Sequence, residues 1–161
     1  MKYLKAGAAF LVAFLIQGSI LNIISAWGHT PNLLLCMVVM LSFLYEEELY
    51  GIIFGAIFGV IYDMCYGFVI GPTAIALVVV AILVIGMRYY ANVENTISML
   101  VVSVIAFVIY YILHWGLYSI AGTPIGLGYV LLTSLGTVIY SLVINLIIYK
   151  ILIKNVVKHH K

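Results

Sequence analysis

The sequence predicts an all-α integral membrane protein with six transmembrane helices, and three observations lead to this prediction. First, 66% of the 161 residues are hydrophobic and only 7% are charged, whereas about 25% of the residues in an ordinary soluble domain are charged. Second, the apolar residues form long runs and lack the alternating pattern of a transmembrane barrel. Third, six alternating spans place every Lys and Arg on one side of the membrane. We therefore expect residues 1–161 to form one polytopic membrane domain.

The predicted spans differ in length. They cover about residues 6–24, 32–45, 50–66, 73–87, 96–118 and 128–153. A bilayer with a hydrocarbon core about 30 Å thick normally requires about 20 helical residues, so the second span is short. It either crosses with the help of its neighbours or is re-entrant.

The distribution of basic residues favours six full crossings. With six alternating spans, all seven basic residues and both termini lie on the same side, which the positive-inside rule makes cytoplasmic. A re-entrant second span would move charged loops to the opposite side. The basic residues are Lys2, Lys5, Arg88, Lys150, Lys154, Lys158 and Lys161.

The stretch from Gly51 to Gly71 has a small or polar residue at every fourth position. Residues four apart lie on one face of a helix, and small residues allow a second membrane helix to approach closely. We therefore expect this helix to lie at the centre of the bundle with the other helices around it. Whether the partner on this face is a helix of this chain or of another protein is left open. The repeated positions are Gly51, Gly55, Gly59, Asp63, Gly67 and Gly71.

Asp63 is the only acidic residue inside a predicted span. A carboxylate at membrane depth is costly and rarely faces lipid, so it has either a functional or a structural role. The functional interpretation is a proton, cation or ligand site, in which only His114 could join a relay. The structural interpretation, which we favour, is a hydrogen bond to neighbouring backbone or to the side chains of Gln17, Asn22 or Asn32.

No known enzymatic motif is present. The sequence lacks a phosphate-binding Gly-Lys loop, HExxH and GxSxG, and no spacing supports a dyad of Ser103 or Ser119 with His114. Cys36 and Cys65 lie in apolar segments without ligand spacing, so we expect both to be small buried side chains. We predict no catalytic residue, no metal site and no cofactor, and the net charge of +2 does not indicate a nucleic-acid partner.

Two motifs resemble the MreD family of bacterial rod-shape-determining membrane proteins. One is the start of the second span, Pro31-Asn32 followed by three leucines, and the other is the Gly-x-x-x-Gly-x-x-x-Asp helix with the turn ending in Gly71-Pro72. The resemblance implies a multi-pass, non-catalytic scaffold of the bacterial cytoplasmic membrane that serves peptidoglycan elongation. It also implies a direct partner, the single-span coiled-coil protein MreC, and through it MreB filaments, RodA and a class B penicillin-binding protein.

MreD-like chains are also similar to the substrate-binding S components of energy-coupling-factor transporters, which implies an S-component-like bundle. The alternative function is therefore the uptake of a vitamin or metal ion, with Asp63, Asn32, His114 and Trp115 lining an outward-facing pocket. The predicted outer loops are short and supply few polar groups to recognise a ligand, so we favour the scaffold. The sequence leaves open whether the chain forms a homo-oligomer within the lipid bilayer.

Overall fold

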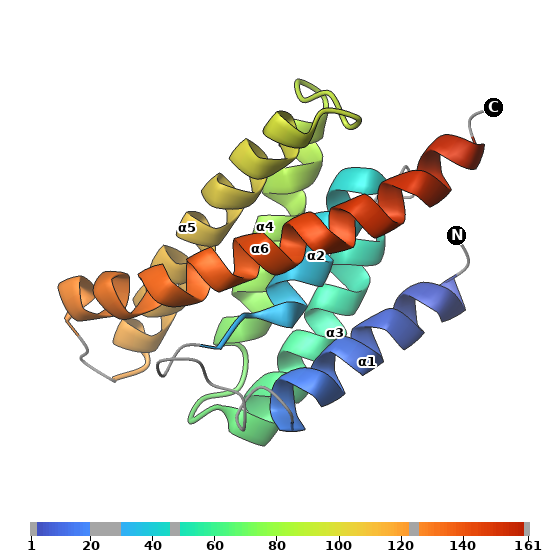
Figure 1. The fold of residues 1–161 in the computed structure, drawn as a ribbon. Helices are drawn as coiled ribbons and strands as arrows, with labels where there is room; N and C mark the ends of the chain where they lie inside the picture. The colour runs from blue at the N-terminus through green and yellow to red at the C-terminus, as the bar shows by residue number, and fades with distance from the viewer. Residues whose placement is uncertain (1–2, 20–29, 46–48, 123–125, 160–161) are drawn as a thin grey trace.

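The computed structural model describes residues 3–19, 30–45, 49–122 and 126–159, and these residues form six helices (Figure 1). Residues 20–24 of the predicted first span, which include Asn22, lie outside the described residues. The last helix continues beyond the predicted end at residue 153. The helices are α1 (Tyr3–Ser19), α2 (Leu33–Leu44), α3 (Leu49–Tyr66), α4 (Pro72–Arg88), α5 (Thr96–Ile120) and α6 (Leu127–His159).

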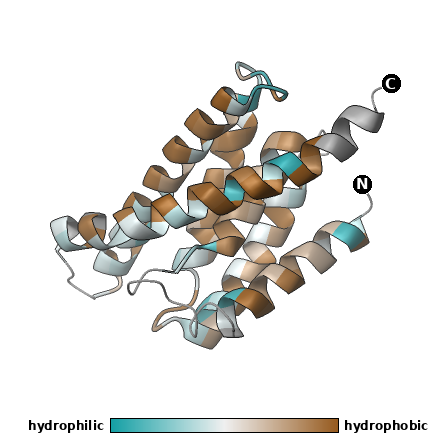
Figure 2. Ribbon diagram, in the orientation of Figure 1, coloured by the Kyte–Doolittle hydropathy of each residue, from teal (hydrophilic) through white to brown (hydrophobic). Residues whose placement is uncertain are grey.

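Three of these helices have the length and composition to cross a membrane. They are the segments Leu49–Tyr66, Thr96–Ile120 and Gly128–Ile153. The other three helices are apolar but shorter, and α2 with its 12 residues is only about 18 Å long at 1.5 Å per residue. Hydrophobic residues cover the outward sides of the bundle as well as its interior (Figure 2), so the fold is an all-α membrane bundle.

The centre of the bundle is α2. All 12 of its residues are buried, and it packs against each of the other five helices. The other five helices surround it, and α1 contacts α3, α3 contacts α4, α4 contacts α5 and α5 contacts α6. In the described part of the chain, α1 and α6 do not contact one another, so the ring around α2 is open between them.

The prediction that α3 is the central helix was wrong. Its outward side is exposed at Ile53, Ile57 and Met64, so α3 belongs to the surrounding ring. Small residues determine which face of a helix packs closely, but they do not require packing on all sides. In a membrane, an apolar helix can be buried or can face lipid, so the uniform sequence of α2 did not identify the centre.

The glycine face of α3 packs against two helices of the same chain. A Cβ atom added to Gly59 would lie 2.5 Å from the Cα of Ala74 in α4, and one added to Gly55 would lie 3.2 Å from Cγ2 of Val38 in α2. A Cβ on Gly51 would collide with the hydroxyl of Ser42 in α2. The backbones of α3 and α4 therefore approach closely because the side chain is missing.

Aromatic rings join α1 to the side of α3. The Phe10 ring stacks on Phe54 and Phe58, with centroid separations of 5.5 and 5.6 Å. These separations lie in the range of favourable aromatic pairs.

A cation lies at the C-terminus of α2. The Arg88 guanidinium donates to the carbonyl oxygen of Tyr45, and the helix dipole favours a positive charge at this position.

Candidate functional site

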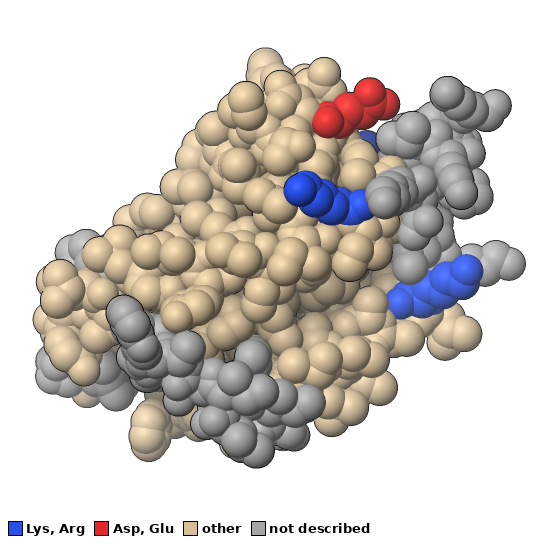
Figure 3. Space-filling model, in the orientation of Figure 1, with Lys and Arg blue, Asp and Glu red and all other residues tan. Residues whose placement is uncertain are grey.

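The charged side chains on the described surface gather at one end of the bundle. Figure 3 shows them at the end where both termini lie in Figure 1. We call this the charged end and the opposite one the uncharged end. The charged residues whose described side chains are not buried are Lys5, Arg88, Glu94 and Lys150.

Asp63 lies in the last turn of α3, where it is 1% exposed. Its Oδ2 atom accepts two backbone hydrogen bonds, from the N–H of Gly71 at 2.9 Å and from the N–H of Thr73 at 3.0 Å. The first N–H groups of a helix have no partner within the helix, and a carboxylate there also interacts favourably with the helix dipole. Asp63 of α3 therefore caps the start of α4.

The turn between Asp63 and α4 depends on two glycines. The N–H of Gly67 donates to the Asp63 carbonyl oxygen at 2.9 Å, and a Cβ at this position would lie 2.7 Å from that oxygen. Gly71 has a φ of 118°, a conformation that residues with a Cβ rarely adopt. Pro72 follows as the first residue of α4, where its missing N–H has no consequence.

His114 of α5 extends the cluster at the start of α4. Its Nε2 atom lies 3.3 Å from the Thr73 hydroxyl, whose own N–H is bound to Asp63. The His114 ring also stacks on Tyr110, with 5.5 Å between the centroids. The second carboxylate oxygen of Asp63, Oδ1, is buried and has no hydrogen-bond partner among the described residues, so this part of the cluster contains one acceptor in excess.

The start of α2 is capped by three side chains. Asn32 is its N-cap, and its Oδ1 accepts from the N–H of Leu35 at 3.0 Å. The N–H of Leu34 donates to Oε1 of Gln17 in α1, and the N–H of Asn32 donates to the hydroxyl of Ser141 in α6. The preceding residue, Pro31, is buried. The residues of both family-like motifs, Pro31-Asn32 and Gly71-Pro72, thus lie where short helices begin.

A further buried polar contact connects α5 to α6. The side-chain amide of Asn145 donates to the Ser103 hydroxyl at 2.8 Å, and that hydroxyl donates to the Met99 carbonyl at 2.8 Å. Neither Asn145 nor Ser141 was predicted from the sequence. Their spacing of four places them on the same helical face, which indicates a shared polar face but does not show which helices that face contacts. Ser103 is therefore engaged with α6 and not with His114.

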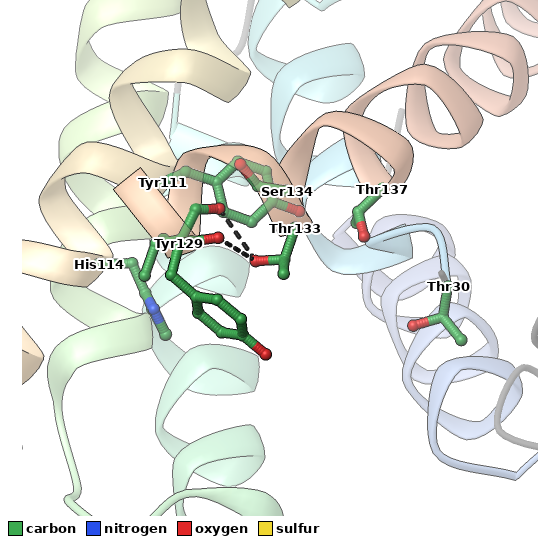
Figure 4. Close-up of a pocket in the computed structure, with 8 residues that line it drawn as sticks. Thr30, Tyr111, His114, Tyr129, Thr133, Ser134 and Thr137 are labelled. Carbon is green, nitrogen blue, oxygen red and sulfur yellow. Dashed lines mark hydrogen bonds between the residues drawn. The ribbon is translucent and has the colours of Figure 1, made fainter. Parts of the chain in front are cut away.

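A hydroxyl-lined groove of about 460 Å³ lies between α5, α6 and the segment before α2. Figure 4 shows His114 and the Tyr129 ring on one side of the groove, with Thr30 and Thr137 on the other. The Thr133 hydroxyl donates to the Tyr129 carbonyl at 2.8 Å. The lining residues are Thr30, Tyr111, His114, Tyr129, Val130, Thr133, Ser134 and Thr137.

The described residues contain no group of three or more His, Cys, Asp or Glu side chains placed to hold a metal ion. The expectation that both cysteines are buried was correct for Cys36 but wrong for Cys65, which is exposed. Cys65 lies in the last turn of α3, on the side opposite its packed face. One side of α3 is buried and the other is exposed, so Cys65 faces outward although Asp63, two residues before it, is buried.

Comparison with known families identifies the chain. The model of the family described as rod shape-determining protein MreD matches residues 3–158. The chain belongs to the MreD family. No curated protein and no solved structure matches it, so these comparisons lend no support to the transporter S component. The family match includes both helix starts, the glycine face of α3 and the groove.

The substitution of Asp63 separates a capping role from a role as a proton or cation site. Both N–H groups bind the same oxygen, Oδ2, so the amide oxygen of Asp63→Asn retains both hydrogen bonds, while the charge is lost and an NH2 group replaces Oδ1. Asp63→Ala leaves the buried N–H of Thr73 without a partner, at a cost of about 1–3 kcal/mol, and also removes the acceptor of the partly buried Gly71 N–H. We expect Asn to lower the thermal unfolding temperature in detergent only slightly, and Ala to lower it severely.

The same two variants also test the capping role of Asp63 in cells, where cell shape is scored in a rod-shaped bacterium that depends on this chain. We expect Asp63→Asn to support rod shape at the wild-type protein level. An Asn variant that accumulates and folds normally but gives round cells would show that the charge itself is needed, and the capping account would then be incomplete.

Proposed function

We propose that this chain is a non-catalytic scaffold of the peptidoglycan elongation machinery that binds MreC in the bacterial cytoplasmic membrane. Membership of the MreD family supports a role in determining rod shape, and this is the observation on which the proposal rests. The helices account for most of the described residues, so this part of the chain has little mass outside the helical bundle. Such a chain acts through contacts made within the membrane and at its two surfaces.

The surface that binds MreC is a lipid-facing side of the bundle in this proposal. The glycine face of α3 is occupied by α2 and α4 of the same chain, which leaves no space for a further helix there. Exposed aliphatic side chains form the outward sides of α3, α5 and α6, including Ile57, Ile105 and Ile139. Complementary packing of side chains, in place of a hydrophobic driving force, would hold the single helix of MreC against one of these sides.

The orientation is the second part of the proposal. The described Lys and Arg side chains lie at the charged end (Figure 3), and excess Lys and Arg mark the cytoplasmic side of a membrane protein. We therefore place the charged end and both termini in the cytoplasm. The groove and the start of α4 then lie on the outer side, and six crossings connect the two sides.

Retention of MreC by Gly59→Ala tests both the scaffold and the assignment of the glycine face. The added methyl group would meet the backbone of Ala74 at 2.5 Å, and overpacking of this kind costs about 1–3 kcal/mol. The matched control is Gly86→Ala in α4, because Gly86 is exposed and has no atom within 4 Å of the new Cβ. Each variant is purified gently from native membranes, and MreC is quantified per folded molecule.

We expect wild type and Gly86→Ala to recover MreC in equal amounts. Gly59→Ala should give less folded protein but unchanged MreC per folded molecule. Failure of the wild-type chain to recover MreC would contradict the scaffold. A Gly59→Ala protein that folds normally and loses MreC would contradict the internal assignment of the glycine face.

Cysteine labelling tests the orientation with one residue at each end. Phe68, in the turn before α4, is 94% exposed, and Tyr90, in the loop after α4, is 97% exposed. In a background in which the native cysteines are replaced, Phe68→Cys should react with a membrane-impermeant maleimide in intact cells. Tyr90→Cys should react only after the membrane is permeabilised. The opposite pattern would invert the topology, and equal labelling would place both loops on one side.

A further inference from the structure

The hydroxyl-lined groove has the chemistry of a binding site. Six of its eight lining residues carry a hydroxyl group and one is a histidine. They come from α5, from α6 and from the segment that leads into α2, so three separate parts of the chain converge on one space. Polar side chains that converge on one space from separate elements are typical of a ligand site.

The lining selects for an uncharged ligand. Among the described lining residues, none is Asp, Glu, Lys or Arg, so neither a carboxylate nor a phosphate would find a full opposite charge. Asp63, which approaches His114 through Thr73, already accepts two backbone N–H groups with Oδ2. A ligand with several hydroxyl groups can both donate to and accept from the Thr, Ser and Tyr side chains.

The groove also offers an aromatic surface. Tyr129 is 68% exposed, and Figure 4 shows its ring extending away from α6 into open space. Tyrosine combines an apolar ring with a polar tip, which suits the boundary between lipid and water. The apolar faces of a sugar ring can pack on such a ring while the sugar hydroxyls bind the threonines.

We propose that this groove binds an uncharged sugar ring, carried into it as the headgroup of a membrane glycolipid. The groove opens at the uncharged end of membrane-spanning helices α5 and α6, where a lipid headgroup and an adjacent bundle surface meet. Its volume of about 460 Å³ lies in the range of small-molecule sites. This inference does not depend on MreC binding.

The test places the full chain in nanodiscs of phosphatidylcholine that contain a minor fraction of monoglucosyl-diacylglycerol. Lipids retained after gentle release are counted by native mass spectrometry. We expect the wild-type chain to retain the glucolipid well above its fraction in the disc. Tyr129→Phe and Thr137→Val each remove one hydroxyl at nearly constant shape, and each should reduce the enrichment about fivefold, as expected for one lost hydrogen bond.

The matched control is Tyr140→Phe. Tyr140 lies on the same helix and is 38% exposed, but it does not line the groove, so this variant should retain the glucolipid as wild type does. An equal loss in Tyr140→Phe, or no enrichment in the wild type, would overturn the proposal. Enrichment of phosphatidylglycerol over the glucolipid in a parallel disc would also overturn it, because that headgroup is charged.

Free glucose distinguishes the two sources of the same ring. Persistence of the glucolipid in millimolar glucose supports a lipid-borne headgroup, in which the acyl chains add to the affinity. Displacement by free glucose, again abolished by Thr137→Val, supports the groove as a site for the sugar ring alone and removes the lipid part of the proposal. Size-exclusion profiles of all variants establish that each loss arises in folded protein.

Discussion

The structure depends on one constraint, that the N–H groups at the start of a helix must find acceptors even when the helix begins within the packed bundle. A backbone N–H group that is buried without an acceptor is expensive. Helices α2 and α4 are both short, and each begins beside the middle or the last turns of a longer neighbour. The acceptors are side chains of those neighbours: Gln17 and Ser141 for α2, and Asp63 for α4.

This constraint explains why the glycine face and the carboxylate occur on one helix. The missing side chain at Gly59 lets α3 approach the backbone of Ala74, which is the residue after Thr73. Asp63 lies one helical turn further along the same face and therefore reaches the N–H groups of Gly71 and Thr73. Close packing and capping are thus two parts of a single contact between α3 and α4.

A second set of polar residues lines the groove between α5, α6 and the segment before α2. Of these, the Thr133 hydroxyl donates within its own helix, in contrast to Asp63, Gln17 and Ser141, which accept from N–H groups at the starts of other helices. His114 connects the two sets, because it contacts the Thr73 hydroxyl at the start of α4 and also lines the groove. A ligand in the groove would therefore lie close to Thr73, whose N–H group is bound by Asp63 at the start of α4.

The sequence predicted the all-α membrane class, since long apolar runs with few charges leave no other solution. It also favoured the structural interpretation of Asp63, because a lone buried acid without a relay most often accepts backbone hydrogen bonds. It could not identify α2 as the centre, because lipid and protein interior are equally apolar. Ser141 and Asn145 were missed because single Ser and Asn residues are common in membrane helices, and only the fold shows that Ser141 meets the start of α2.

The most direct test of this account is the hydrogen exchange of the Gly71 and Thr73 amides, measured by NMR on the full chain in nanodiscs. We predict slow exchange at both amides in the wild type and in Asp63→Asn, and fast exchange at both in Asp63→Ala. The amide of Val80, in the middle of α4 and buried, should remain protected in all three proteins. Fast exchange of Gly71 and Thr73 in the wild type, or protection that survives in Asp63→Ala, would contradict the role of Asp63 as the cap of α4.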